Sequence, residues 1–260
     1  MYQTLDIERR GQVATIWMNR PAVFNAFDQQ LIAELATACA ALDADDSVRV
    51  VVLGGRGKHF SAGADLNWMR QAASASHEQN LEDARIFADM LRTLAHMSKP
   101  TIARVQGAAL GGGTGLTAAC DMAVAASDAV FSTSEVKFGI IPSAISPYVL
   151  RAIGPRHALR YFQSAERIHA ERALAIGLVS EVVAPELLDT CLDQLVEALL
   201  QGGPLAKQAA KDLVGAVYAQ PIDEKISEET AQRIAYQRTT EEAKEGFSAF
   251  FDKRPPEIGR

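Results

Sequence analysis

The feature that most constrains the fold of this chain is a glycine-rich stretch directly after an apolar, strand-like run. Residues 104–121 read RVQGAALGGGTGLTAACD and contain five glycines in eighteen positions. Glycine has no Cβ, so such a stretch lets two backbones, or a backbone and a ligand, approach closely. Three interpretations follow: a phosphate-binding turn, a tight joint between a helix and a strand, and a loop whose backbone N–H groups meet a substrate.

Length, charge and cysteine content narrow the class of protein. The 260 residues suit one large domain or a core with a small appendage. The formal net charge of −6 argues against a nucleic-acid surface, because phosphate binding needs clustered Lys and Arg. Cys39, Cys120 and Cys191 are widely spaced, which predicts buried thiols in a reducing compartment. With no signal-peptide pattern and no apolar run of about 18 residues, we expect a soluble cytoplasmic protein that does not enter membranes.

The order of the expected elements predicts a layered α/β core followed by helices. Short β-branched runs predict strands, and Asp28 is a candidate cap for an early helix. The expected strands are 2–8, 12–19, 49–55, 101–106 and 122–126. Beyond residue 145 the pattern becomes helical. The expected helices there are 147–163, 169–176, 185–200, 204–217 and 222–251, which either complete the core or reach toward a partner subunit.

A dinucleotide-binding turn is the first interpretation of the glycines. Residues 113–118 satisfy the pattern G-x-G-x-x-A, and Glu135 follows Gly113 by 22 residues. In that motif, however, the strand runs directly into the first glycine, whereas Gly107 and three further residues intervene here. The chain also lacks a phosphate-binding GxxxxGK[ST] sequence. We therefore do not expect a bound dinucleotide.

The other two interpretations remain open from the residues alone. Small residues let a helix lie close to a strand, which is a purely structural role. A glycine-rich turn that opens a helix also presents unpaired N–H groups, and these can hold a carbonyl oxygen that becomes an oxyanion. A second donor would be needed, and the loop HFSAGADL at 59–66 is the candidate. Asp65 in that loop is equally well explained as a helix cap.

At these residues the chain resembles the enoyl-CoA hydratase/isomerase family, also called the crotonase superfamily. The matching segments occur in the family's order, span nearly the whole chain, and are specific in combination. They are NRPAVFNAF (19–27), GKHFSAGADL (57–66), VQGAALGGGTGL with CD (105–121), SEVKFGIIP (134–142), RALAIGLVSEVV (172–183) and FSAFFDKRPP (247–256). Within the family, the motifs look most like those of bacterial methylglutaconyl-CoA hydratases of leucine breakdown.

The resemblance implies an α/β fold of the crotonase type. Repeated ββα turns would form a spiral, and a C-terminal helical region would build a homotrimer or a dimer of trimers. We accordingly predict a core at 1–195, which holds the active site, and an oligomerisation region at 196–260. The substrate would be an acyl-CoA thioester, with coenzyme A as part of the substrate and no metal or other cofactor.

The resemblance also implies roles for individual residues. The backbone N–H groups of Ala64 and Gly112 would form the oxyanion hole, and Glu135 would be the acid/base carboxylate. Six further residues would contact the substrate, namely Ala26, Ala62, Asp65, Leu66, Gly111 and Ser143. With the thioester oxygen held by two donors, the neighbouring C–H becomes acidic enough for a carboxylate to move its proton.

The chain departs from the family pattern at Gly115. Hydratases with two catalytic glutamates carry one of them at this position. Gly115 is then either a packing glycine or a space left for a bulkier acyl group. If Glu135 acts alone, helped by Ser143, Ser146 or Thr114, hydration of an enoyl-CoA is the favoured function. The alternatives are a Δ3,Δ2-enoyl-CoA isomerase, which needs a single base, and a catalytically weak acyl-CoA-binding protein.

Overall fold

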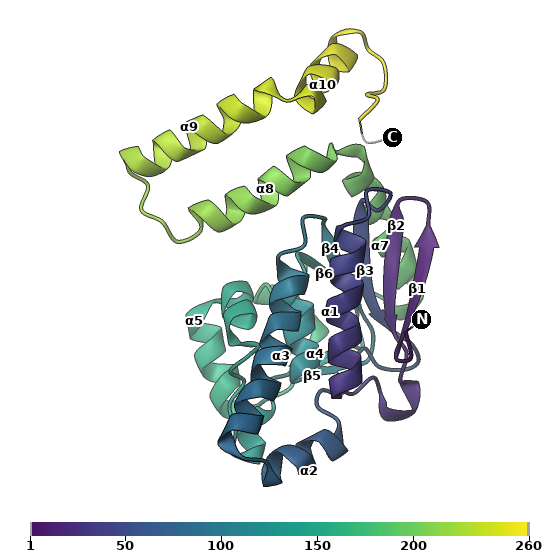
Figure 1. The fold of residues 1–260 in the computed structure, drawn as a ribbon, viewed down its shortest axis with the longest axis vertical. Helices are drawn as coiled ribbons and strands as arrows, with labels where there is room; N and C mark the ends of the chain where they lie inside the picture. Colours follow the sequence, from purple (N-terminus) through teal and green to yellow (C-terminus); the bar gives the residue numbers. More distant parts are fainter. Residues whose placement is uncertain (1, 259–260) are drawn as a thin grey trace.

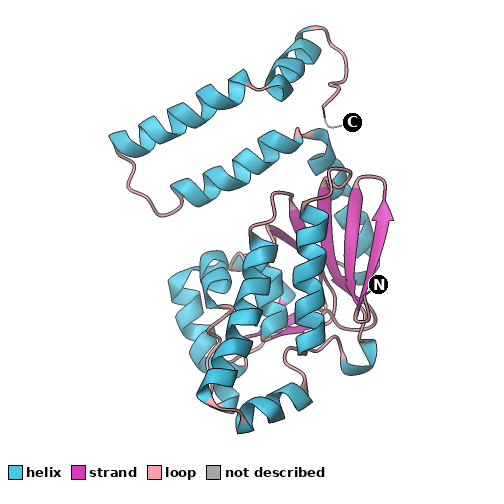
Figure 2. Ribbon diagram, viewed as in Figure 1, coloured by secondary structure: helices cyan, strands magenta, loops and turns pink. Residues whose placement is uncertain are grey.

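Two sheets of different size form the centre of the molecule. The computed structural model describes residues 2–258; its larger sheet has the strand order β1-β2-β3-β4-β6-β9 and its smaller sheet the order β5-β7-β8 (Figures 1 and 2). The strands of the larger sheet are β1 (Leu5–Arg10), β2 (Val13–Met18), β3 (Val50–Gly55), β4 (Thr101–Val105), β6 (Met122–Ala126) and β9 (Glu181–Val183). Those of the smaller sheet are β5 (Ala108–Leu110), β7 (Val130–Ser132) and β8 (Ile168–His169).

The connections between the strands produce the expected ββα repeat. Within residues 2–258, only the hairpin β1–β2 is antiparallel in the larger sheet, and the other neighbouring strands are parallel. Parallel neighbours need crossover connections, which helices supply here. Strand β4 is followed by β5 in the other sheet and then by a helix, and β6 is followed in the same way by β7 and a helix. The fold is therefore the crotonase-type α/β fold that the sequence predicted, with helices at its C-terminal end.

Helices connect the strands and form the C-terminal end of the molecule, and those between residues 145 and 217 begin and end near the predicted residues. They are α1 (Gln29–Asp43), α2 (Leu66–Ser74), α3 (His77–Ala95), α4 (Gly112–Ala119), α5 (Ser146–Ser164), α6 (Ala170–Ala175), α7 (Leu188–Gln201), α8 (Pro204–Val217), α9 (Glu224–Thr239) and α10 (Glu241–Phe251), with short 3-10 turns η1 (Pro21–Val23), η2 (Glu135–Phe138) and η3 (Pro185–Leu187). Asp28 caps α1 by accepting a hydrogen bond of 2.8 Å from the Leu31 N–H, as predicted.

Apolar side chains from both faces of the larger sheet form two clusters. On one face, α1 and α3 pack against the sheet and bury residues such as Ile16, Leu35 and Leu91. On the other face, α7 places Leu188, Leu192 and Val196 against the strands. Successive side chains of a strand point to opposite faces of the sheet, so the same strands contribute side chains to both clusters.

The C-terminal helices extend away from this core. Figure 1 shows α8 and α9 side by side above the sheets, with α10 continuing from α9. The predicted single helix at 222–251 is wrong, because Thr240 leaves helical geometry and caps α10 with its side chain. The predicted boundary at residue 195 falls within α7, and α8 begins at Pro204; the division into two units stays a prediction.

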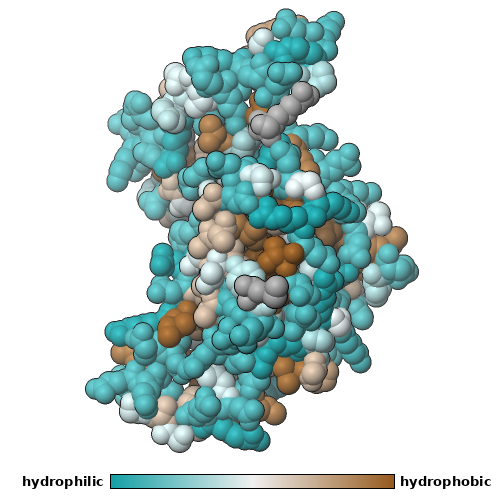
Figure 3. All heavy atoms as spheres, turned by 45° about the vertical axis from the view of Figure 1, so that its right-hand side comes forward, coloured by the Kyte–Doolittle hydropathy of each residue, from teal (hydrophilic) through white to brown (hydrophobic). Residues whose placement is uncertain are grey.

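The surface in Figure 3 is mostly hydrophilic, with hydrophobic residues in separate patches. Some of the most exposed large hydrophobic side chains belong to the C-terminal helices and their connections, among them Ile222, Tyr236, Phe250 and Phe251. Within residues 2–258, none of the helices combines the length and the apolar character that crossing a bilayer requires.

Candidate active site

The glycine-rich stretch is a strand, a sharp turn and the first turn of a helix. Strand β5 ends at Leu110, which is the register partner of Ser132 on β7. Gly111 then adopts φ +50° and ψ −115°, a conformation that favours glycine, and α4 begins at Gly112. The Gly111 N–H donates to the Ser132 carbonyl at 2.7 Å. Strands β5 and β7 therefore end side by side. This places the start of α4 next to the segment that follows β7.

The second predicted loop runs along the same strand. The Ser61 N–H donates to the Ala108 carbonyl at 3.0 Å, and the Leu110 N–H donates to the Ser61 carbonyl at 2.9 Å. At Gly63, φ is +89°, and a Cβ there would lie 2.9 Å from the Leu110 carbonyl oxygen. Only glycine permits this approach of the two backbones without strain. The structure thus brings together the two loops that the sequence paired.

Two backbone N–H groups are available where these loops meet. The neighbours of Ala64 bond to Phe27, since the Phe27 N–H donates to the Gly63 carbonyl and the Asp65 N–H donates to the Phe27 carbonyl. Gly112 lies in the first turn of α4, where backbone N–H groups have no partner within the helix. Neither the Ala64 nor the Gly112 N–H donates a hydrogen bond within residues 2–258.

Glu135 lies over the turn that opens α4. It is the first residue of η2 and follows β7 by three residues. Its Oε1 atom lies 3.3 Å from the position that a Cβ on Gly111 would occupy. Its Oε2 atom is buried and has no hydrogen-bond partner within the described chain. Burial raises the pKa of this carboxyl group, and a hydrogen bond from its own backbone N–H offsets the rise only in part.

The predicted substrate-binding residues fall into two groups. Ala26, Ala62 and Gly111 belong to backbone segments fixed by hydrogen bonds, including one of 2.9 Å from the Ala62 N–H to the Phe24 carbonyl. Leu66 and Ser143 are exposed, and no hydrogen bond within residues 2–258 joins the Ser143 hydroxyl to Glu135. A contact of Leu66 and Ser143 with substrate therefore stays a prediction.

Asp65 has a structural role in this structure. Its carboxylate caps α2 by accepting from the Asn67 N–H at 2.8 Å and forms an ion pair with Arg20 at 3.3 Å. Arg20 also pairs with Asp28 at 2.8 Å and donates to the Ala26 carbonyl. These contacts tie the segment before α1 to the loop at 59–66.

The space beside Gly115 is filled by protein. A Cβ on Gly115 would overlap the Cγ2 atom of Ile145 and lie 2.7 Å from its Cβ. The packing interpretation of this glycine is therefore confirmed, and a space for a bulkier acyl group beside it is wrong. Thr114 is also an unsuitable helper for Glu135, because it is fully buried and its hydroxyl donates to the Ala109 carbonyl at 2.7 Å.

An aromatic cluster behind Gly112 was not predicted from the sequence. A Cβ on Gly112 would lie 2.9 Å from Phe27 and 3.1 Å from Phe87. The rings of Phe27 and Phe87 are 5.7 Å apart, and Trp68 lies 6.4 Å from Phe87. The aromatic residues of NAF (25–27) and of the helix at 77–95 were visible in the sequence, but their meeting depends on the tertiary fold. They bring apolar surface to the start of α4 at Gly112.

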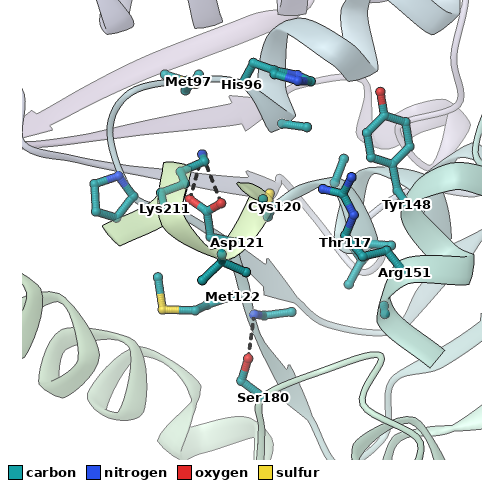
Figure 4. A pocket seen from close by; sticks show the side chains of 18 of the residues that line it. His96, Met97, Thr117, Cys120, Asp121, Met122, Tyr148, Arg151, Ser180 and Lys211 are labelled. Carbon is teal, nitrogen blue, oxygen red and sulfur yellow. Dashed lines mark hydrogen bonds and ion pairs between the residues drawn. The ribbon is translucent and has the colours of Figure 1, made fainter. Parts of the chain in front are cut away.

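A cavity of about 830 Å³ lies at the other end of α4 and does not include Glu135. Figure 4 shows its lining, in which Asp121 forms an ion pair of 2.9 Å with Lys211 of α8. Asp121 also accepts a hydrogen bond from the Thr101 N–H at 2.9 Å. The carboxylate in this cavity is thus paired, whereas the Oε2 atom of Glu135 is not.

Comparisons with known proteins agree with this geometry. Residues 8–260 match the family model described as enoyl-CoA hydratase/isomerase, and the chain belongs to that family. It is 34% identical to the crotonyl-CoA hydratase of Syntrophomonas wolfei, over 97% of this chain and 96% of that protein. It is also 34% identical to the 2,3-dehydroadipyl-CoA hydratase of Escherichia coli, over 98% of both chains. The crystal structure of an enoyl-CoA hydratase from Shewanella pealeana superposes with a TM-score of 0.95 at 40% identity, covering 98% of this chain and 96% of that one.

Proposed function

We propose that this enzyme adds water across the 2,3 double bond of an enoyl-CoA thioester, with Glu135 as its acid/base group. The observation that carries the proposal is the position of the Glu135 carboxylate over Gly111, directly before the unpaired Gly112 N–H. An oxyanion donor and a proton-transfer group thus lie at one helix end. The family membership and the hydratase relatives support the same activity.

In this proposal the Ala64 and Gly112 N–H groups bind the thioester oxygen. They stabilise the negative charge that develops there when water attacks C3, and each such donor typically contributes about 3 kcal/mol to lowering the barrier. The positive end of the α4 dipole acts in the same direction. Since the donors are fixed by the neighbouring hydrogen bonds, little reorganisation accompanies the reaction.

Glu135 supplies the proton chemistry. As a carboxylate it accepts a proton from the attacking water, and it returns a proton to C2, so that water is added with no change of oxidation state. General acid–base catalysis of this kind contributes about 10²–10⁴ in rate. A raised pKa makes Glu135 a better base than an ordinary glutamate and a competent acid near neutral pH.

One observation favours a second function. Ile145 occupies the space beside Gly115, so no second carboxylate adjoins the site at that position. A Δ3,Δ2-enoyl-CoA isomerase needs only one base, which takes a proton from C2 and returns it to C4. A catalytically weak acyl-CoA-binding protein is the remaining alternative.

Substrate class and assembly belong to the same proposal. A branched or carboxylated acyl group, as in 3-methylglutaconyl-CoA, rests on the motif resemblance, and the Escherichia coli relative named for a dehydroadipyl substrate supports a carboxylated chain. A homotrimer or a dimer of trimers would cover exposed side chains of the C-terminal helices, such as Phe250 and Phe251. We propose no cofactor beyond the coenzyme A of the substrate; the cytoplasmic location stays a prediction from the sequence.

Mass-resolved product analysis in ¹⁸O-labelled water tests the proposal. Crotonyl-, 3-methylglutaconyl- and 3-enoyl-CoA are each incubated with the enzyme. We expect a 3-hydroxyacyl-CoA that carries one solvent oxygen from at least one of the first two substrates. If the only product forms from the 3-enoyl-CoA and has unchanged mass, the enzyme is an isomerase and hydration is rejected. If no substrate is converted, the remaining hypothesis is a catalytically weak acyl-CoA-binding protein.

A further inference from the structure

Two glycines at the start of α4 have different neighbours. Gly111 is the residue before α4, and Gly115 follows it by four residues, about one helical turn further along. The Gly115 N–H donates to the Gly111 carbonyl at 3.1 Å, which confirms this geometry. The Glu135 carboxylate lies over Gly111, and the Ile145 side chain lies over Gly115. Carboxylate and isoleucine therefore lie against two glycines that are about one helical turn apart.

Ile145 is held firmly in this position. It is the residue before α5, where its carbonyl accepts hydrogen bonds of 3.1 Å from the Tyr148 and Val149 N–H groups. Only 2% of its surface is exposed. A β-branched side chain also has few rotamers to choose from. A side chain at Gly115 would therefore have to displace the start of α5.

Nearby hydroxyl groups do not replace the missing carboxylate. The Thr114 hydroxyl proton is committed to backbone carbonyls, and the Ser146 hydroxyl donates to the Ser143 carbonyl at 2.7 Å. The contact between Gly115 and Ile145 thus leaves the adjacent turn of α4 apolar.

Charged groups on the elements around Glu135 are engaged elsewhere. α4 contains no ionisable side chain before Cys120. The first ionisable residues of α5, Tyr148 and Arg151, line the cavity at the far end of α4. In the loop at 59–66, Asp65 is paired with Arg20, and His59 accepts a hydrogen bond from the Ala108 N–H at 3.0 Å. Lys137, on the same 3-10 turn as Glu135, is exposed.

We infer that Ile145 is a specificity-determining residue: by filling the space over Gly115 it limits the room for water on that side of Glu135. The inference rests on the proposed function, because it concerns whether Glu135 catalyses hydration or the double-bond shift. In hydration, water oxygen bonds to C3 and a proton from Glu135 ends on C2. In the double-bond shift, Glu135 takes a proton from C2 and returns it to C4. Room for water beside Glu135 favours the first outcome over the second.

The test is Ile145→Ala with Ile153→Ala as the matched control. Ile153 is the same residue type, lies on the same helix α5, and is 4% exposed. Each variant and the wild type receive a 3-enoyl-CoA in ¹⁸O-labelled water, and the ratio of hydrated to double-bond-shifted product is measured by mass. We expect Ile145→Ala to raise this ratio by about tenfold, which corresponds to about 1.4 kcal/mol between the two barriers, while Ile153→Ala leaves it unchanged.

A second readout separates specificity from simple loss of packing. Water beside Glu135 reduces its desolvation, so Ile145→Ala also moves the acidic limb of the pH–kcat/KM profile to lower pH, and Ile153→Ala does not. If Ile145→Ala fails to fold, Ile145→Val removes one methyl group and shows a smaller change in the same direction. If a folded Ile145 variant shows an unchanged product ratio and an unchanged acidic limb, this inference is overturned but the proposed function is not. Absence of wild-type turnover on every enoyl-CoA would instead overturn the proposed function.

Discussion

Glu34 and Glu135 are two glutamates shielded from water by opposite kinds of surroundings. Glu34, on α1, accepts hydrogen bonds from the Gln3 and Thr4 N–H groups, the Thr4 hydroxyl and the Gln30 amide, all between 2.6 and 3.1 Å. Burial opposes its ionisation, but these hydrogen bonds outweigh burial and lower its pKa to about 2. Burial of Glu135 is not offset in this way, and its pKa is raised.

The number of hydrogen-bond partners thus distinguishes a glutamate that stabilises the fold from one whose carboxylate is available for proton transfer. The carboxylate of Glu34 fixes the start of the N-terminal strand to α1 and has no capacity left for a ligand. The Oε2 atom of Glu135 has no partner within the described chain, a state that costs stability and suits the base that we propose. Removing each side chain should therefore affect different properties of the protein.

The largest expected effect is on activity in Glu135→Gln. Glutamine keeps the shape but cannot transfer the proton, so kcat/KM on enoyl-CoA substrates should fall by about 10²–10⁴. The free energy of unfolding should stay equal or rise, because an unsatisfied buried carboxylate is removed. Steady-state kinetics and urea unfolding at neutral pH measure the two quantities. Full activity in this variant would remove Glu135 from the mechanism.

A smaller loss of activity is expected from Gly63→Ala. The new Cβ would lie 2.9 Å from the Leu110 carbonyl oxygen and so push the loop at 59–66 away from α4. A displacement of about 1 Å at reacting groups costs about 10² in rate. Gly11→Ala is the control, since Gly11 also has a positive φ but no atom lies within 4 Å of its added Cβ. Equal kcat/KM values for the two variants would show that the approach of the loops is unimportant.

Glu34→Gln should have the reverse signature of Glu135→Gln. Losing charged hydrogen bonds in a buried position should lower the free energy of unfolding by about 2 kcal/mol at neutral pH. The kcat/KM value should change less than twofold, about 0.4 kcal/mol in barrier terms, because Glu34 lies away from the glycine-rich turn. Chemical unfolding and steady-state kinetics on one preparation measure the free energy of unfolding and kcat/KM. A large loss of kcat/KM without a loss of stability would contradict the structural role of Glu34.

The pH dependence of stability gives the smallest and most graded effect. The folded-state pKa of Glu34 is about 2, below the ordinary value of 4.5, so its stabilising contribution is present above pH 4.5 and is lost as pH falls toward 2. Between these values the free energy of unfolding should fall more steeply in the wild type than in Glu34→Gln. Parallel curves for the two proteins would show that the Glu34 hydrogen bonds contribute no stability.

Sequence alone predicted the parts of this site that are local in the chain. The cap at Asp28 and the turn at Gly111 and Gly112 each carry a short-range signal. The candidate carboxylate Glu135 came from the resemblance of SEVKFGIIP to the family, and its role stays a prediction. Strands β5 and β7 were missed because three residues are too few for a recognisable alternation. The contact of Ile145 with Gly115 and the pairing of Glu34 with Thr4 each join residues 30 apart, and only the fold brings them together.

The central claim is that Glu135 carries out the proton chemistry without a second carboxylate. The pH dependence of wild-type kcat/KM tests it most directly, since its acidic limb reports the ionisation of the essential base in the free enzyme. We predict a limb with a slope of one and a midpoint above 4.5, because burial raises the pKa of Glu135. A limb with a slope of two, or a midpoint at or below 4.5, would contradict the account by requiring a second carboxylate or an ordinary, well-solvated one.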